Sequence, residues 1–121
     1  MSQKYTLVLG ASSKPDRYSY KAVKMLHQHQ HPILAIGNKT GQIDNIPIEV
    51  VQRMVEGIDT VTLYLNENKQ QQYYDYIFAL HPKRIIFNPG AENDELAELA
   101  KKRNIKTMEA CTLVLLSTGQ Y

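Results

Sequence analysis

The chain has 121 residues, of which 43% are hydrophobic, and its formal net charge is +2. This length suffices for one domain with its own core, and we predict a single domain over residues 1–121. So small a net charge gives no general attraction to nucleic acid or to a membrane surface, and we expect neither as a partner. The sequence contains no apolar stretch near the ~18 residues of a membrane span and no signal-peptide pattern at its start. A single cysteine excludes an internal disulfide framework, so we expect a soluble protein of the cytoplasm.

Short apolar segments alternate with amphipathic ones along the chain, which is the pattern of strands followed by helices. Strands are predicted at 5–10, 33–36, 60–65, 84–87 and 105–108. Helices are predicted at 17–29, between Asn66 and His81 and at 92–103. The short apolar segment 111–116 is compatible with a helix or a strand, and we favour a helix. Between the second and third strands, residues 46–48 favour a short extended piece and 50–55 one or two helical turns.

This alternation predicts an α/β fold, because right-handed crossovers between such units produce a parallel sheet with helices on both faces. We expect a single-domain, doubly wound, Rossmann-like fold with a five-stranded parallel sheet in the order 3-2-1-4-5. Ligands in such sheets lie beyond the carboxyl ends of the strands, where the strand order reverses. In the expected order this point lies between the first and fourth strands.

The connection between the first strand and the first helix is a candidate phosphate site. It reads G-A-S-S-K-P-D-R, a turn of small residues before an amphipathic segment. Backbone N–H groups at a helix N-terminus attract anions, and phosphate is the commonest. The pattern is weaker than a full G-x-G-x-x-G, so a plain tight turn is the alternative.

The loop after the second strand reads Gly37-Asn38-Lys39 and contains no carboxylate. Domains that bind NAD carry an acidic residue there for the ribose hydroxyls. A lysine instead suits a phosphate on the ribose, as in NADP or coenzyme A. The alternative for Lys39 is an ordinary solvated loop residue.

Three motifs occur in order, namely G-A-S-S-K-P-D-R-Y-S-Y, F-N-P-G-A-E-N-D-E-L and E-A-C-T-L-V-L. Together they resemble the small CoA-binding, Rossmann-type domain family, and the chain is similar to the CoA-binding domain of the succinyl-CoA synthetase α subunit. The resemblance covers essentially the whole chain and implies that it binds coenzyme A or an acyl-CoA. The loop G-N-K-T departs from the N-P-x that this family more often shows.

The resemblance also implies which residues contact the ligand. The diphosphate would lie on the first turn, the adenosine and its 3′-phosphate near the second loop, and the pantetheine near the loop after the fourth strand. The cofactor-binding residues expected in this way are Gly10, Ala11, Ser12, Ser13, Lys14, Arg17, Tyr18, Gly37, Asn38, Lys39, Asn66, Asn88, Pro89, Gly90 and Ala91.

A few other residues are weaker candidates. Cys111 follows the fifth strand and is a candidate for contact with the CoA thiol, although a buried inert cysteine is the commoner case. Tyr18 is a candidate cover for the ligand. His27 and His31 have i, i+4 spacing, but two ligands without a third predict no metal site.

The predicted function is non-catalytic binding of CoA or an acyl-CoA, as a sensor or regulatory module, because no nucleophile, base and acid can be grouped. One alternative is a small NADP-dependent reductase. A second is an interaction protein with a vestigial nucleotide pocket, which could form a homo-oligomer through the helix containing Tyr73–Phe78.

Overall fold

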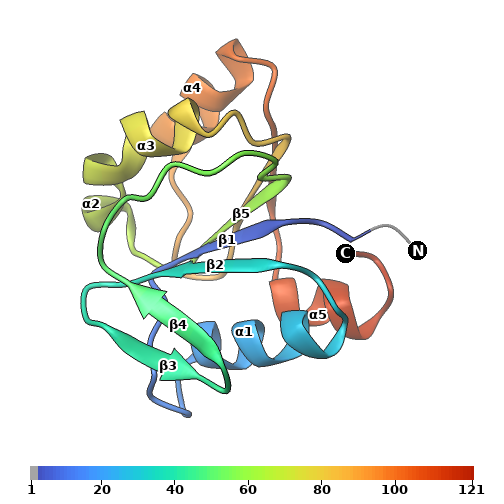
Figure 1. The fold of residues 1–121 in the computed structure, drawn as a ribbon. Helices are drawn as coiled ribbons and strands as arrows, with labels where there is room; N and C mark the ends of the chain where they lie inside the picture. The colour runs from blue at the N-terminus through green and yellow to red at the C-terminus, as the bar shows by residue number, and fades with distance from the viewer. Residues whose placement is uncertain (1–2) are drawn as a thin grey trace.

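The structure is a computed structural model, and it describes residues 3–121 (Figure 1). The strands are β1 Thr6–Leu9, β2 Ile33–Ile36, β3 Gly41–Ile43, β4 Ile46–Glu49, β5 Thr60–Leu63, β6 Arg84–Phe87 and β7 Lys106–Glu109. The helices are α1 Tyr18–Gln28, α2 Glu67–Gln70, the 3₁₀ turn η1 Gln71–Tyr73, α3 Tyr74–Ala79, α4 Asp94–Lys102 and α5 Thr112–Ser117. Within the described residues the strands form one seven-stranded sheet in the order β3-β4-β2-β1-β5-β6-β7.

The α/β, Rossmann-like class is confirmed, but the five-stranded sheet in the order 3-2-1-4-5 is wrong. The third predicted strand, β5, pairs with β1 and not with β2. The outer side of β2 is taken by β4, which pairs with it in parallel. All four residues of β5 are buried, which requires a position inside the sheet and not at its edge. The strand order therefore reverses between β1 and β5.

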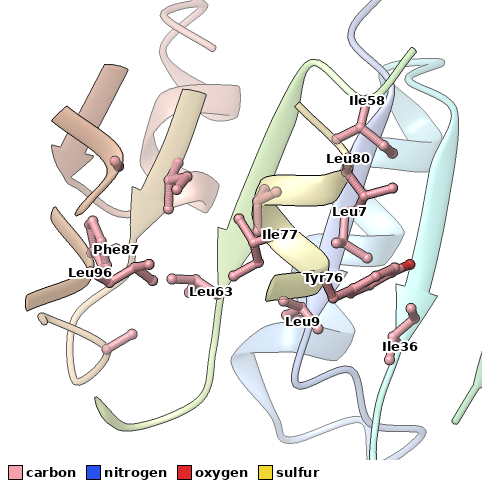
Figure 2. Close-up of a cluster of buried hydrophobic side chains, with 14 of the residues drawn as sticks. Leu7, Leu9, Ile36, Ile58, Leu63, Tyr76, Ile77, Leu80, Phe87 and Leu96 are labelled. Carbon is pink, nitrogen blue, oxygen red and sulfur yellow. The ribbon is translucent and has the colours of Figure 1, made fainter. Parts of the chain in front are cut away.

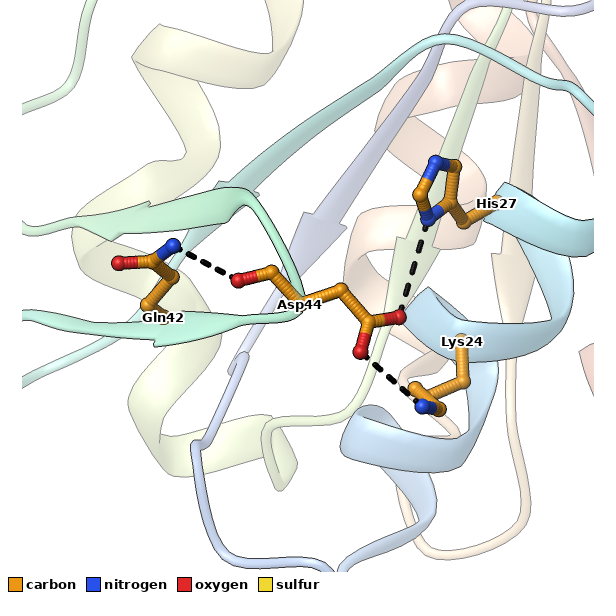
Figure 3. A network of polar contacts seen from close by, with 4 residues as sticks. All are labelled: Lys24, His27, Gln42 and Asp44. Carbon is orange, nitrogen blue, oxygen red and sulfur yellow. Dashed lines mark hydrogen bonds and ion pairs between the residues drawn. The ribbon is translucent and has the colours of Figure 1, made fainter.

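The β3–β4 hairpin accounts for the two additional strands. The extended piece at 46–48 is confirmed as part of β4, and β3 pairs with it antiparallel. At the hairpin turn, Asp44 has a φ of +53°. Figure 3 shows how the Asp44 carboxylate attaches the turn to α1: it accepts a hydrogen bond from Lys24 Nζ at 3.1 Å and lies 3.8 Å from His27 Nδ1. This carboxylate raises the pKa of Lys24.

Residues 50–55 form no helix, so that prediction is wrong. The chain crosses from β4 to β5 in an irregular segment. Its apolar side chains face solvent, with exposed fractions of 46% for Val50, 67% for Val51 and 59% for Met54. Short helices depend on burying an apolar face for their stability, and this segment buries little of one.

Helices cover both faces of the sheet (Figure 1), with α1 and α5 on one side and α2, α3 and α4 on the other. Each face has its own cluster of buried apolar side chains. Figure 2 shows the larger cluster, in which Ile77 of α3 and Leu96 of α4 pack over Leu63 and Phe87 of the strands. These layers hold the carboxyl ends of the strands in place.

The helix predictions for 92–103 and 111–116 are confirmed as α4 and α5. Asn93 caps α4 by accepting a hydrogen bond from Leu96 N at 3.1 Å, and Asn104 leaves it with a φ of +59°. No helix in residues 3–121 has the length and apolar character that crossing a bilayer requires.

Candidate functional site

The carboxyl ends of four neighbouring strands are level. Leu9 of β1 pairs with Ile36 of β2 and with Leu63 of β5, and Leu63 pairs with Phe87 of β6. The loops that follow these four strands line one cleft of about 720 Å³. The cleft lies over the point where the strand order reverses, the usual ligand position in sheets of this type.

The turn after β1 forms the floor of the cleft. Gly10 has a φ of +94°, a conformation that suits glycine. The N–H groups of Gly10 and Ala11 both donate to Ile36 O, at 2.9 and 3.0 Å, so they are not available to a ligand. In the described part of the chain, the N–H groups of Ser12 and Ser13 have no such partner. The turn therefore offers amides from its second half.

The N-terminus of α1 also lacks the groups that usually stabilise a helix end. Its N-cap residue, Arg17, makes no side-chain capping hydrogen bond, and the first turn of the helix contains no acidic residue. Both ordinary ways of stabilising a helix N-terminus are missing here. The end of α1 is therefore open to an external anion, next to the Ser12 and Ser13 amides.

Close packing between loops fixes the shape of this turn. A Cβ atom on Gly37 would lie 2.2 Å from the carbonyl oxygen of Ala11, so the loop after β2 rests directly on the turn after β1. A Cβ on Gly41 would lie 3.1 Å from Ser13 Cβ, so the β3–β4 hairpin also contacts it. Glycine at position 37 is required by this close approach.

The cleft is lined by four cationic side chains and by no carboxylate: Lys14, Arg17, Lys39 and Lys69. All four residues are exposed. The ion pairs within residues 3–121 involve Lys24, His27 and Arg53, so none of the four cleft cations is neutralised by a carboxylate. Like charges collected in this way favour a ligand with several negative charges.

One wall of the cleft was predicted only through Asn66, and its other residues were not predicted. It consists of residues that follow β5 and continue through η1, namely Tyr64, Leu65, Lys69, Gln72 and Tyr73. The sequence contained a usable signal, because β5 ends at the same edge as β1. Asn66, which was predicted, caps α2 by accepting a hydrogen bond from Lys69 N at 3.2 Å.

Most of the predicted site residues lie together along this cleft. Those that line it are Gly10, Ala11, Ser12, Ser13, Lys14, Arg17, Gly37, Asn38, Lys39, Asn66, Pro89 and Gly90. Those that do not line it are Tyr18, Asn88, Ala91 and Cys111.

Asn88 lies beneath the cleft, 2% exposed. Its Nδ2 donates to Thr62 Oγ1 at 2.7 Å and to Leu63 O at 2.9 Å, and its Oδ1 accepts from Thr112 N at 2.9 Å. With its amide engaged on both sides, Asn88 connects β5, β6 and the start of α5.

A second buried amide, Gln70, connects the new wall to the loop after β6. Its Nε2 donates to Leu65 O and to Ala91 O, both at 2.7 Å, and its Oε1 accepts from Asn93 Nδ2 at 2.9 Å. Gln70 is fully buried. Ala91 therefore takes part in the architecture through its carbonyl group.

The remaining candidates lie away from the cleft lining. Tyr18 is 68% exposed, and the ammonium group of Lys21 lies 5.2 Å from the centre of its ring. Cys111 is half-buried and precedes α5 as its N-cap residue. His31 Nδ1 accepts a hydrogen bond from Lys4 N, whereas His27 faces Asp44. No group of three or more metal-ligating side chains occurs in residues 3–121.

Tyr64 has a buried hydroxyl with no hydrogen-bond partner among the described residues. Burial raises the pKa of this hydroxyl, so the group stays protonated. The nearby hydroxyls of Thr62 and Thr112 oppose the rise, but they bond to each other at 2.8 Å.

The fold and the position of the cleft define a small Rossmann-like α/β domain. The chain belongs to the CoA binding domain family, whose pattern matches residues 4–117. None of the curated proteins matches the sequence.

Solved structures agree with this assignment of the fold. One crystal structure, titled as that of an uncharacterized protein, is 43% identical, with full coverage of both chains and a TM-score of 0.97. A hypothetical protein from Pyrococcus horikoshii OT3 is 19% identical over 96% of this chain and 83% of its own, with a TM-score of 0.86. A protein from Thermus thermophilus is 17% identical over 98% of this chain and 91% of its own, with a TM-score of 0.84.

Proposed function

We propose that the protein binds coenzyme A or an acyl-CoA in this cleft, and that it acts as a sensor or regulatory module. The observation that carries the proposal is the group of four cations with no carboxylate among them. Coenzyme A has a diphosphate and a 3′-phosphate, so it brings about four negative charges at neutral pH. NAD brings about half as many, and the acidic residue that usually holds its ribose is absent here.

The binding mode follows from the order of the loops along the sheet edge. The diphosphate lies over the Ser12 and Ser13 amides, with Lys14 and Arg17 beside it. Lys39, after the neighbouring strand β2, faces the 3′-phosphate of the ribose. The pantetheine then extends in the other direction, toward Pro89 and Gly90 after β6.

A binding role fits the cleft better than a catalytic one. Its lining contains no histidine, cysteine, aspartate or glutamate, the side chains that most often transfer protons near neutral pH. A reductase would have to rely on the cofactor with tyrosine or lysine as the only titratable groups.

Isothermal titration with CoA, dephospho-CoA and NADPH tests this proposal. CoA is expected to bind more tightly than dephospho-CoA, because only CoA carries the 3′-phosphate. Lys39→Ala should remove most of this preference, about tenfold, while leaving dephospho-CoA binding unchanged. Lys102→Ala, on the exposed last turn of α4, is the matched control.

Two results would contradict the proposal. A wild-type protein that binds neither CoA nor dephospho-CoA has no such function. Tighter binding of NADPH than of CoA, with hydride transfer to an added acceptor, would favour the reductase instead.

A further inference from the structure

We propose that Lys69 is a phosphate-binding residue, which contacts the diphosphate of the ligand from the wall opposite the Gly10–Arg17 turn. This inference rests on the proposed function and adds to it a residue from the wall that follows β5. Three observations support it: the position of Lys69, the way the chain holds it, and the charge around it.

The wall that carries Lys69 lies against the phosphate turn. A Cβ atom on Gly10 would be 3.1 Å from the backbone carbon of Tyr64 and 3.1 Å from Leu65 Cδ2. Lys69 lies in the short helix α2, four residues after Leu65, and lines the same cleft. Lys39 is on the far side of the turn, after β2, so Lys69 is the cation on the β5 side.

The backbone at Lys69 is held in place from both sides. Its N–H donates to Asn66 Oδ1, which fixes the start of α2. Its neighbour Gln70 is fully buried and bonds to Leu65 O, Ala91 O and Asn93. Because the backbone here is already fixed, anion binding by Lys69 orders only its side chain and no loop, which favours a specific contact over general attraction.

The total charge of the four cleft cations matches the roughly four negative charges of coenzyme A. Lys39 faces the 3′-phosphate in the proposed mode, which leaves Lys14, Arg17 and Lys69 for the diphosphate. Glu67, the acidic residue of α2, forms no ion pair with Lys69 among the described residues. A free ammonium on the second wall allows the diphosphate to be held between two sides of the cleft.

The test compares the loss of affinity for two ligands that share the diphosphate. Lys69→Ala is expected to weaken CoA and dephospho-CoA by the same factor, about tenfold, measured by isothermal titration. Lys69→Arg, which keeps the charge, should retain most of the affinity. Lys102→Ala should change neither, and urea unfolding should show that all three variants keep wild-type stability.

Other outcomes would overturn the inference and are distinct from a failure of the proposed function. Unchanged affinity for both ligands, with wild-type binding intact, would show that Lys69 does not contact the ligand. A loss confined to CoA would assign Lys69 to the 3′-phosphate instead of the diphosphate. If the wild-type protein binds neither ligand, the proposed function fails and this inference with it.

Discussion

Two groups of polar side chains lie at the same edge of the sheet and differ in exposure, in charge and in hydrogen bonding. Lys14, Arg17, Lys39 and Lys69 line the cleft, are exposed and have no carboxylate partner in the described residues. Asn88 and Gln70 lie directly beneath, are buried and use both ends of their amides in internal hydrogen bonds.

This difference predicts which residues affect ligand affinity and which affect the stability of the fold. A buried amide that meets all its partners stabilises the fold and has nothing left for a ligand. An exposed cation without a partner contributes little to stability and remains available. Changes in the lower group should therefore affect unfolding, and changes in the upper group should affect affinity.

The strongest way to break this comparison is Asn88→Leu. The change leaves Leu63 O and Thr112 N buried without a partner, and we expect unfolding to become easier by about 3 kcal/mol. Urea unfolding measures this, with the exposed Asn68→Leu on α2 as control. Wild-type stability together with weakened CoA binding would place Asn88 among the ligand contacts.

Gly37→Ala tests whether the loop after β2 holds in place the turn after β1, which carries two of the cations. The new methyl group would meet Ala11 O at 2.2 Å, so the phosphate turn must move. We expect a loss of about 2 kcal/mol in stability and a clear loss of CoA affinity in the same variant. Thr40→Ala in the same exposed loop should change neither, and a Gly37→Ala protein with normal CoA binding would show that the turn tolerates displacement.

His31 extends the comparison to pH. Burial, first of all, lowers its pKa, and its Nδ1 must be unprotonated to accept from Lys4 N at 3.0 Å. The unfolded chain binds a proton near pH 6.5 and the folded chain does so only at lower pH, so stability should fall as pH drops below 6.5. Urea unfolding between pH 7.5 and 5.5 should show this fall, smaller in His31→Asn and retained in the exposed His81→Asn. An equal fall in all three proteins would assign it elsewhere.

The smallest effect is expected for Tyr64→Phe. The hydroxyl that is removed is buried and has no partner among the described residues. Its loss should therefore either raise the free energy of unfolding or lower it by no more than about 0.5 kcal/mol. Thermal unfolding of the variant measures this. A loss of more than 2 kcal/mol would show that the hydroxyl is satisfied in solution.

The sequence was sufficient for the fold class and for the cleft loops after β1, β2 and β6, but after β5 it indicated only Asn66. The turn at Gly10–Ser13 and the loop at Gly37–Lys39 were recognisable because their glycines and small residues mark tight turns directly after buried strands. The strand order was not recognisable, because it depends on which strand takes the outer side of β2. That is decided by the β3–β4 hairpin, whose short strands and Pro47 give weak local signals.

The same limit explains the site. Asn88 is a polar residue directly after a strand, so in the sequence it looks like a ligand contact. Only the three internal hydrogen bonds of its side chain show that its amide is already engaged. Lys69 was overlooked for the opposite reason. Asn66 was expected at the site from the same connection, but an exposed lysine three residues later on a helix has no local feature that marks it as a cleft residue.

The level ends of β2, β1, β5 and β6 give the cleft a fixed length. Strands about 4.8 Å apart place the first and last of these four ends about 14 Å from one another. In the proposed binding mode, this row of strand ends selects ligands by their length. A long ligand collects contacts at both ends, whereas a short mononucleotide reaches only one, so abundant small nucleotides are disfavoured by size alone.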